Sequence, residues 1–309
     1  MPGLADKRLV FVTGKGGVGK STIALALGIA AARRGLRTIV AELSGQARAA
    51  ETYGVASTVG QEVALSDGLH ATSVETEHAL EEYLHERAGR VGDLLAASRA
   101  FHAFAHATPG MRELMTFGKA WELAQDPRRI SGHAPYDLVI VDAPATGHAL
   151  GGLRTPRTFA EIARVGPIAS QGRTIDASLR DPSHTAVLAV ALPEEMPVTE
   201  TLDLRRRLPE AIGLELAGVV VNACLPERLG PRQARTVADA LASAGGKRAA
   251  QAALRTALSE HARASGQREQ IARLAEGLGS PPLELPYLFA EALDPAALGT
   301  LADRLEELL

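Results

Sequence analysis

The sequence contains a single cysteine, Cys224, so no disulfide can form within the chain. No Cys or His residues have the spacing of a zinc site either, and we expect a reducing, cytoplasmic setting. Long hydrophobic runs are also missing, because the longest near the amino end, residues 23–32, falls well short of the ~20 residues that a membrane span requires. It follows a glycine-rich loop rather than the charged start of a signal peptide, so we expect no transmembrane segment.

Neither sign of charge dominates the sequence, which carries 33 Lys and Arg against 36 Asp and Glu and a net charge of −3. Because there is no global basic field, the composition argues against a nucleic-acid partner. Residues 228–273 are an exception, with nine Arg or Lys and three Asp or Glu. Such a run usually forms a solvated helix face, and the alternative is a docking surface for an acidic partner.

Aromatic residues make up only 4% of the sequence, so aliphatic side chains must fill the core. Short apolar runs predict buried strands, with helix-like segments between them, at residues 9–13, 36–43, 138–141, 186–192, 217–222 and 283–285. Continuous rather than alternating hydrophobicity is typical of parallel strands that are covered on both faces. We therefore predict an α/β fold with a doubly wound, mostly parallel sheet.

The length of 309 residues fits one layered domain, residues 1–309, with a subsidiary lobe. Residues 75–130 depart from the alternation of strands and helices, so we predict a small helical subdomain inserted there.

Apolar side chains at helical spacing lie in that insertion, at Met111, Met115, Phe117 and Trp121. They form either core or an exposed groove for an apolar partner. His102 and His106 are one helical turn apart and could bind a metal, but they have no third ligand.

Residues 14–21, GKGGVGKS, fit the pattern GxxxxGK(S/T) between a predicted strand and a predicted helix. Glycines let the backbone curl so that successive N–H groups point at phosphate oxygens, and the helix amino terminus adds partial positive charge. We expect Lys20 to reach the β- and γ-phosphates and the hydroxyl of Ser21 to ligate Mg²⁺. The residues predicted to bind the nucleotide here are Gly14, Gly16, Gly17, Val18, Gly19, Lys20, Ser21 and Thr22.

Asp142 ends an apolar strand, where ligands of open α/β sheets bind. We expect its carboxylate to join Ser21 in the magnesium shell. Thr146, Gly147 and His148 then provide a hydroxyl, a flexible position and a titratable ring near the expected γ-phosphate. A loop that changes shape on hydrolysis requires such residues.

The lysine at position 15 within KGGVGKS resembles the deviant Walker A loop of the SIMIBI-like P-loop NTPases. Asp142, the segment 146–150 and Pro156 resemble the corresponding region of the arsenite-pump and tail-anchored-protein-targeting ATPase family. Three further segments are similar to landmarks of that family, at residues 109–113, 199–201 and 220–222. The resemblance spans nearly the whole chain.

This resemblance implies a dimeric ATPase that uses ATP and Mg²⁺ and couples ATP binding and hydrolysis to conformational change and to the handling of a client. It implies that Lys15 reaches the nucleotide of the other subunit and that Asn222 binds the adenine with the loop at Pro286 and Tyr287. The dimer is a homodimer or a heterodimer with a related ATPase, and its client is a protein or a membrane-associated partner. The catalytic residues that it implies are Lys15, Lys20 and Asp142.

The sequence also departs from the family, because Ser44 stands where the family has the aspartate that orients the attacking water. Glu42 and Gln46 are the candidates for that role, since a glutamine orients water in related nucleotide switches. Otherwise hydrolysis is slow or depends on a paired subunit. Cys224 alone supplies neither the zinc clamp nor the metalloid site of family members.

Three other functions stay open at this point. The first is a catalytically weak subunit that activates a related chain. The second is a spatial regulator of the partitioning or septum-positioning type, which binds membrane or DNA. The third is a small-molecule kinase, which uses the same loop but transfers the phosphoryl group to an acceptor.

Overall fold

The computed structural model describes residues 3–88, 98, 108, 110–128, 134–244, 248–290 and 292–309. Their strands are β1 (Leu9–Gly14), β2 (Thr38–Glu42), β3 (Val63–Ser66), β4 (Leu69–Ser73), β5 (Leu138–Ala145), β6 (Thr185–Ala191), β7 (Gly218–Cys224) and β8 (Leu283–Pro286). They form one sheet in the order β3-β4-β2-β5-β1-β6-β7-β8. All pairs are parallel except β3 with β4 at one edge. The predicted doubly wound, mostly parallel sheet is confirmed.

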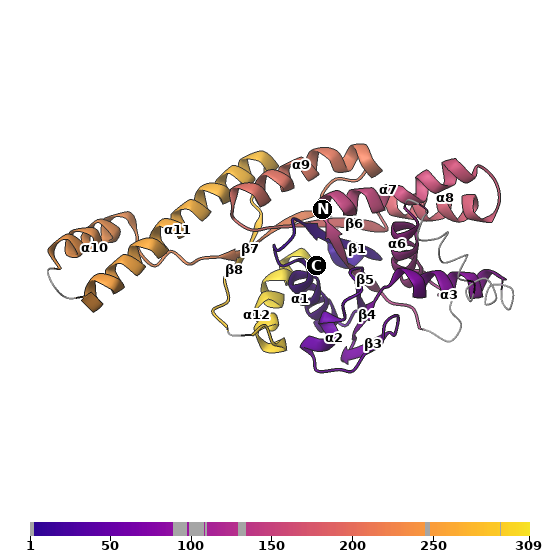
Figure 1. The fold of residues 1–309 in the computed structure, drawn as a ribbon, viewed down its shortest axis with the longest axis horizontal. Helices are drawn as coiled ribbons and strands as arrows, with labels where there is room; N and C mark the ends of the chain where they lie inside the picture. The colour runs from indigo at the N-terminus through magenta and orange to yellow at the C-terminus, as the bar shows by residue number, and fades with distance from the viewer. Residues whose placement is uncertain are drawn as a thin grey trace.

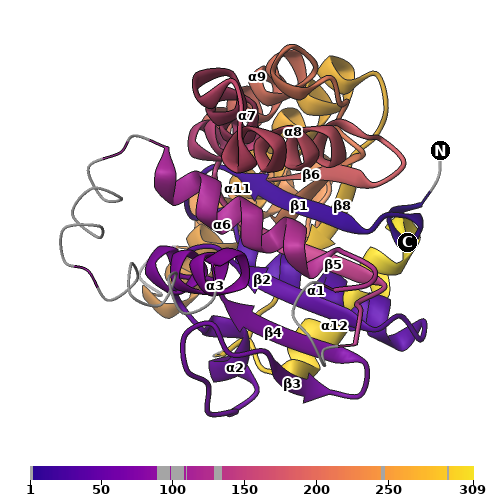
Figure 2. The same cartoon turned by 90° about the vertical axis from the view of Figure 1, so that its right-hand side faces the viewer.

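The helices of the described residues cover both faces of this sheet (Figures 1 and 2). They are α1 (Lys20–Arg33), α2 (Arg48–Thr52), α3 (Thr76–Ala88), α6 (Met111–Leu123), α7 (Thr146–Ala163), α8 (Pro167–Arg180), α9 (Glu195–Ile212), α10 (Pro231–Ser243), α11 (Arg248–Leu278) and α12 (Pro295–Leu305), with short 3₁₀ turns at Leu4–Asp6 and Glu306–Leu308. Within this part of the chain, no helix combines the length and the apolar character that crossing a membrane needs.

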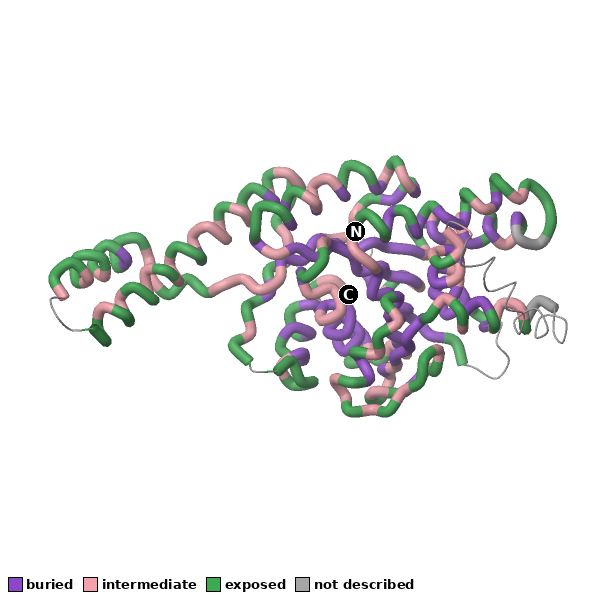
Figure 3. Tube along the Cα trace, viewed as in Figure 1, coloured by how far each residue is buried: buried purple, intermediate pink, exposed green. Residues whose placement is uncertain are grey.

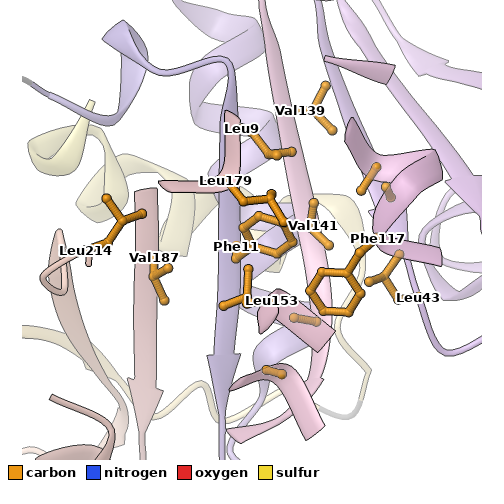
Figure 4. Packing of buried hydrophobic residues seen from close by; sticks show 14 of the residues in the cluster. Leu9, Phe11, Leu43, Phe117, Val139, Val141, Leu153, Leu179, Val187 and Leu214 are labelled. Atoms are coloured by element: carbon orange, nitrogen blue, oxygen red, sulfur yellow. The ribbon is translucent and has the colours of Figure 1, made fainter. Parts of the chain in front are cut away.

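Alternate residues of β1 enter two separate cores, one on each face of the sheet. Leu9 and Phe11 pack with side chains of α6, α7, α8 and α9, whereas Val10 and Val12 pack with α1 and α12. All four are at most 1% exposed, which is why a continuous apolar run predicted this strand. Figure 4 shows the first core, where the ring of Phe11 stacks on that of Phe117 with 5.4 Å between the centroids.

The apolar stripe of α6 divides between core and cavity. Phe117 and Trp121 are each 1% exposed, and Trp121 Nε1 donates a hydrogen bond of 3.0 Å to Ser178 Oγ on α8. Met111 and Met115 instead line an apolar cavity of about 450 Å³ between α3, α6, α7 and α8. Met115 also packs against the first core, so the core interpretation holds for Phe117 and Trp121 and, in part, for Met115.

Helices α3 and α6 pack against each other within the segment predicted as a helical insertion. The two histidines predicted as a possible metal pair, His102 and His106, lie outside the described residues. The boundaries 75–130 of that insertion stay a prediction.

Helices α10 and α11 pack together and project from the β7–β8 edge of the molecule, as Figure 1 shows at the left. Their residues are mostly exposed or half-buried (Figure 3). This hairpin contains most of the basic stretch found in the sequence.

Candidate functional site

The loop between β1 and α1 is held against the neighbouring strands so tightly that two of its glycines cannot be replaced. A Cβ on Gly14 would lie 2.1 Å from the carbonyl oxygen of Val190 in β6. A Cβ on Gly19 would lie 2.4 Å from Asn222 Nδ2 in β7, and the φ of Gly19 is +92°. Helix α1 begins at the next residue and no side chain caps its first turn. Its free N–H groups and the loop amides therefore form a site suited to an anion such as phosphate.

Three of the predicted residues meet beside this loop. Lys20 Nζ donates to the carbonyl oxygen of Lys15 at 3.2 Å, and Ser21 Oγ donates to Asp142 Oδ2 at 2.5 Å. Asp142 is 5% exposed, and burial raises the pKa of its carboxyl, against the opposing effects of Ser21 and Lys20. Burial lowers the pKa of Lys20, although the charge of Asp142 acts in the other direction. A desolvated carboxylate beside a hydroxyl oxygen is a donor set that fits Mg²⁺.

Glu42 lies next to Asp142, because β2 and β5 pair in parallel with these two residues in register. Glu42 is 2% exposed and both its carboxylate oxygens accept from the N–H of Ala49, at 3.2 and 3.3 Å. Burial raises the pKa of Glu42 to about 7, and the charge of Asp142 adds to this, while the bond from Ala49 lowers it. The other candidate for orienting water, Gln46, is exposed in the loop after β2, as is Ser44.

The raised pKa of Glu42 predicts how stability depends on pH in the absence of metal and nucleotide. The folded chain keeps this proton up to about pH 7, whereas the unfolded chain releases it near the ordinary pKa of 4.5. Between these values the folded state binds more protons, so the free energy of unfolding falls as pH rises. At 1.36 kcal/mol per pKa unit, the loss attributable to Glu42 is on the order of 3 kcal/mol.

The Glu42→Gln variant should lack this loss. Urea unfolding in EDTA at pH 5 and pH 8 should show the variant gaining on the natural chain by about that amount toward the higher pH. Equal changes in the two proteins would contradict the assignment.

Lys15 is paired within its own chain. Its Nζ lies 2.5 Å from Oε1 of Glu200 on α9, and each side chain is about one-third exposed, at 33% and 35%. An exposed pair of this kind stabilises a protein by only ~0–1 kcal/mol, so it is easily exchanged for another partner. A role for Lys15 in a second subunit requires that this pair first opens.

Asn222 fastens the end of β7 to the glycine-rich loop. Its Nδ2 donates to the carbonyl oxygen of Val18 at 3.0 Å, and its Oδ1 accepts from the N–H of Ala223 at 2.9 Å. A cavity of about 450 Å³ opens beside it, next to the loop. The predicted nucleotide-binding residues that line this cavity are Gly17, Val18, Gly19, Thr22, Asn222, Pro286 and Tyr287.

Two residues of α11 also line this cavity, and the sequence did not predict them. They are Arg263 and Gln267. Gln267 Oε1 accepts from the N–H of Leu225 at 2.8 Å, and its Nε2 donates to the carbonyl oxygen of Ala223 at 3.3 Å. Helix α11 is thereby attached to the loop that follows β7.

Gly147 and His148 lie in the first turn of α7, which begins at Thr146 directly after β5. Both are exposed, and nothing would lie within 4 Å of a Cβ on Gly147. The sequence predicted a loop here, and the structure shows a helix start at the same edge of the sheet as Asp142.

Comparison with known proteins gives a consistent result. The sequence model of a family described as anion-transporting ATPases matches residues 7–166 and 160–236. The chain is 30% identical to ATPase BagA of Mycobacterium tuberculosis, over 98% of this chain and 94% of that protein. It is 29% identical to a putative arsenical pump-driving ATPase of Halobacterium salinarum, over 73% of this chain and 37% of that protein. Identity to ATPase get3 of Neurospora crassa is 28%, over 77% of this chain and 70% of that protein.

Proposed function

This chain belongs to the anion-transporting ATPase family and is an ATPase, and we propose that it binds ATP with Mg²⁺ at the β1–α1 loop and acts as a dimer. Binding and hydrolysis of ATP drive a change in the arrangement of its helices and thereby act on a client. The observation that carries this proposal is the hydrogen bond from Ser21 to Asp142 directly beneath the loop. It joins two oxygen ligands suited to Mg²⁺ at the place where the phosphates bind.

In the proposed site, charged and polar groups bind the phosphates and the metal, and a cavity encloses the adenine. The loop amides and the ammonium group of Lys20 bind the β- and γ-phosphates, and Ser21 and Asp142 hold the metal. When bound, Mg²⁺ would neutralise charge that develops on the phosphate oxygens. Asn222 and the loop at Pro286 and Tyr287 enclose the adenine in the adjoining cavity.

The second subunit supplies Lys15 to the nucleotide of the first, after the pair with Glu200 opens. The dimer is a homodimer or a heterodimer with a related ATPase. One observation favours slow hydrolysis by this chain on its own. Ser44 and Gln46 are exposed, and Glu42 is buried on the Ala49 amide, so this free chain presents no carboxylate at the position of the family's aspartate.

The client of this ATPase is a protein or a membrane-associated partner, and the protein works in the cytoplasm. The apolar cavity lined by Met111 and Met115 supports this part of the proposal, because an apolar partner needs such a surface.

Isothermal calorimetry tests the nucleotide proposal directly. Titrating ATP into the natural chain with Mg²⁺ should give saturable heat, and affinity should fall when EDTA removes the metal. A Ser21→Ala variant should retain binding of ATP but lose most of the difference that Mg²⁺ makes, since one of the two metal ligands is gone. Absence of heat with the natural chain would overturn the proposal.

A further inference from the structure

The hairpin of α10 and α11 begins at the nucleotide cavity and extends well beyond it. We call the described residues 231–244 and 248–266, which are α10 with the residue after it and the first part of α11, the arm. The residue that follows the arm, Gln267, hydrogen-bonds the backbone of Ala223 and Leu225 beside the cavity. At 1.5 Å per residue, α11 runs roughly 29 Å from Gln267 to its start at Arg248. We call the side of the sheet where the strands end and the nucleotide cavity lies the nucleotide edge. The arm extends beyond this edge (Figure 1).

The arm has little support from the rest of the molecule. The element that α10 chiefly contacts is α11, whereas the other end of α11 packs on α9. Ala234 is the only buried residue of α10, and the large apolar side chains of the two helices within the arm are half-buried, at Val237, Leu241, Leu254 and Leu258. Most of the arm's surface is thus available to a partner.

The exposed surface of the arm is basic and uncompensated. Five of its arginines are exposed and form no ion pair with the described part of the chain, namely Arg232, Arg235, Arg248, Arg255 and Arg263. At the base, by contrast, Arg228 pairs with Glu260 at 3.0 Å and Arg268 pairs with Glu227 at 3.3 Å. The arm has five Arg and two Asp or Glu, a charge of +3.

The rest of the same chain is acidic. Because the whole chain carries −3, the part outside the arm carries −6. Some of this charge lies at the nucleotide edge itself, where exposed Glu194 and Glu195 begin α9 and are followed by Met196, an apolar side chain that is 59% exposed. If the nucleotide edge of a second copy faces this edge, the glutamates of the second copy lie on the side toward which the arm of the first copy projects.

We propose that the arm is a clasp between two copies of this chain, in which the arginines of one arm lie against the acidic surface of the other copy. This inference rests on the proposed function, in which two nucleotide edges face each other. Because the arm is basic and the rest of the chain is acidic, the arm of one copy is attracted to the rest of the other copy. A nucleic acid is disfavoured as the partner, because the acidic part of the chain repels it. The arm also links the proposed contact between copies to the nucleotide, because Arg263 of the arm and the adjoining Gln267 line the nucleotide cavity.

Sedimentation velocity with Mg²⁺ and a non-hydrolysable ATP analogue tests the clasp. In the R248E/R255E variant the dimer dissociation constant should rise at least about tenfold at low salt, and its dependence on salt should become much weaker. The control R206E/R207E changes the net charge equally on the solvent side of α9, where these side chains are 77% and 58% exposed, and should dimerise like the natural chain.

Calorimetric binding of ATP and the unfolding temperature of each variant show whether the site and fold are intact. A normal dimer of R248E/R255E would overturn the inference. A natural chain that binds ATP yet stays monomeric would also overturn the inference, but it would leave the nucleotide proposal standing. A natural chain that does not bind ATP would instead overturn the nucleotide proposal. Salt-dependent binding of the arm to duplex DNA, lost in R248E/R255E while its dimer is normal, would assign the arm to nucleic acid instead.

Discussion

The Lys20→Ala variant is expected to hydrolyse ATP at least ~10²-fold more slowly than the natural chain. Lys20 is the first residue of α1, and its ammonium group lies over the glycine-rich loop, bonded to the carbonyl oxygen of Lys15. In the proposed complex it would meet the oxygens on which charge increases as the γ-phosphate leaves, and removal of one such group commonly costs 10²–10³ in rate. The other lysine of the loop has a different place, because Lys15 is paired with Glu200 in the free chain and is proposed to reach the nucleotide of the other subunit in the dimer.

Two further variants make this measurement decisive. Lys20→Arg keeps the charge but introduces a planar fork into a loop that closes around a compact ammonium, so it should restore little of the rate. Arg34→Ala removes an exposed cation from the other end of α1, where it bonds the carbonyl oxygen of Glu306, and should leave turnover unchanged. If release of phosphate by Lys20→Ala equals that of the natural chain, the measured activity comes from a contaminant.

The sequence predicted the parts of this site that are local along the chain. The glycine-rich loop follows one buried strand and precedes one helix, so its residues are fixed by short-range geometry. The hairpin of β3 and β4 was missed because its strands are short and interrupted by polar residues, of which Thr72 and Ser73 in β4 are buried. Asp67-Gly68 lies in the turn between them, and this dipeptide is a hairpin signal that could have found it.

Contacts between distant residues could not be predicted in the same way. Gln267 reaches the backbone of Leu225 and Ala223 across 42 and 44 residues, and Lys15 reaches Glu200 across 185. No local pattern distinguishes these residues from other polar side chains on amphipathic helices. Their positions depend on how α9 and α11 pack on the sheet, which the periodicity of either helix leaves open.

A buried network of charges beside β3 and β4 also joins residues that are distant in the sequence. Arg128, whose side chain is fully buried, donates two hydrogen bonds of 2.8 Å to Glu62 and bonds of 3.2 and 3.0 Å to Glu122 on α6. Tyr136 donates a further bond of 2.8 Å to Glu62. Lys119 extends the network by pairing with Glu122 at 3.3 Å and with Oε2 of Glu82 on α3 at 2.7 Å. These contacts attach both helices to the edge of the sheet.

The Arg128→Met variant is therefore expected to be less stable by about 3–5 kcal/mol at neutral pH, because two carboxylates lose the guanidinium that both of them share. Burial alone would raise the pKa of Glu62, but the hydrogen bonds and charge of Arg128 outweigh it and hold this pKa at about 2. Since the unfolded value is 4.5, that contribution is fully present above about pH 4.5 and is lost as pH falls toward 2. Urea unfolding should thus show the difference between variant and natural chain shrinking below pH 4.5. Arg157→Met removes an exposed pair with Glu161 and should cost under ~1 kcal/mol, so an equal effect of the two substitutions would show that the network adds nothing to stability.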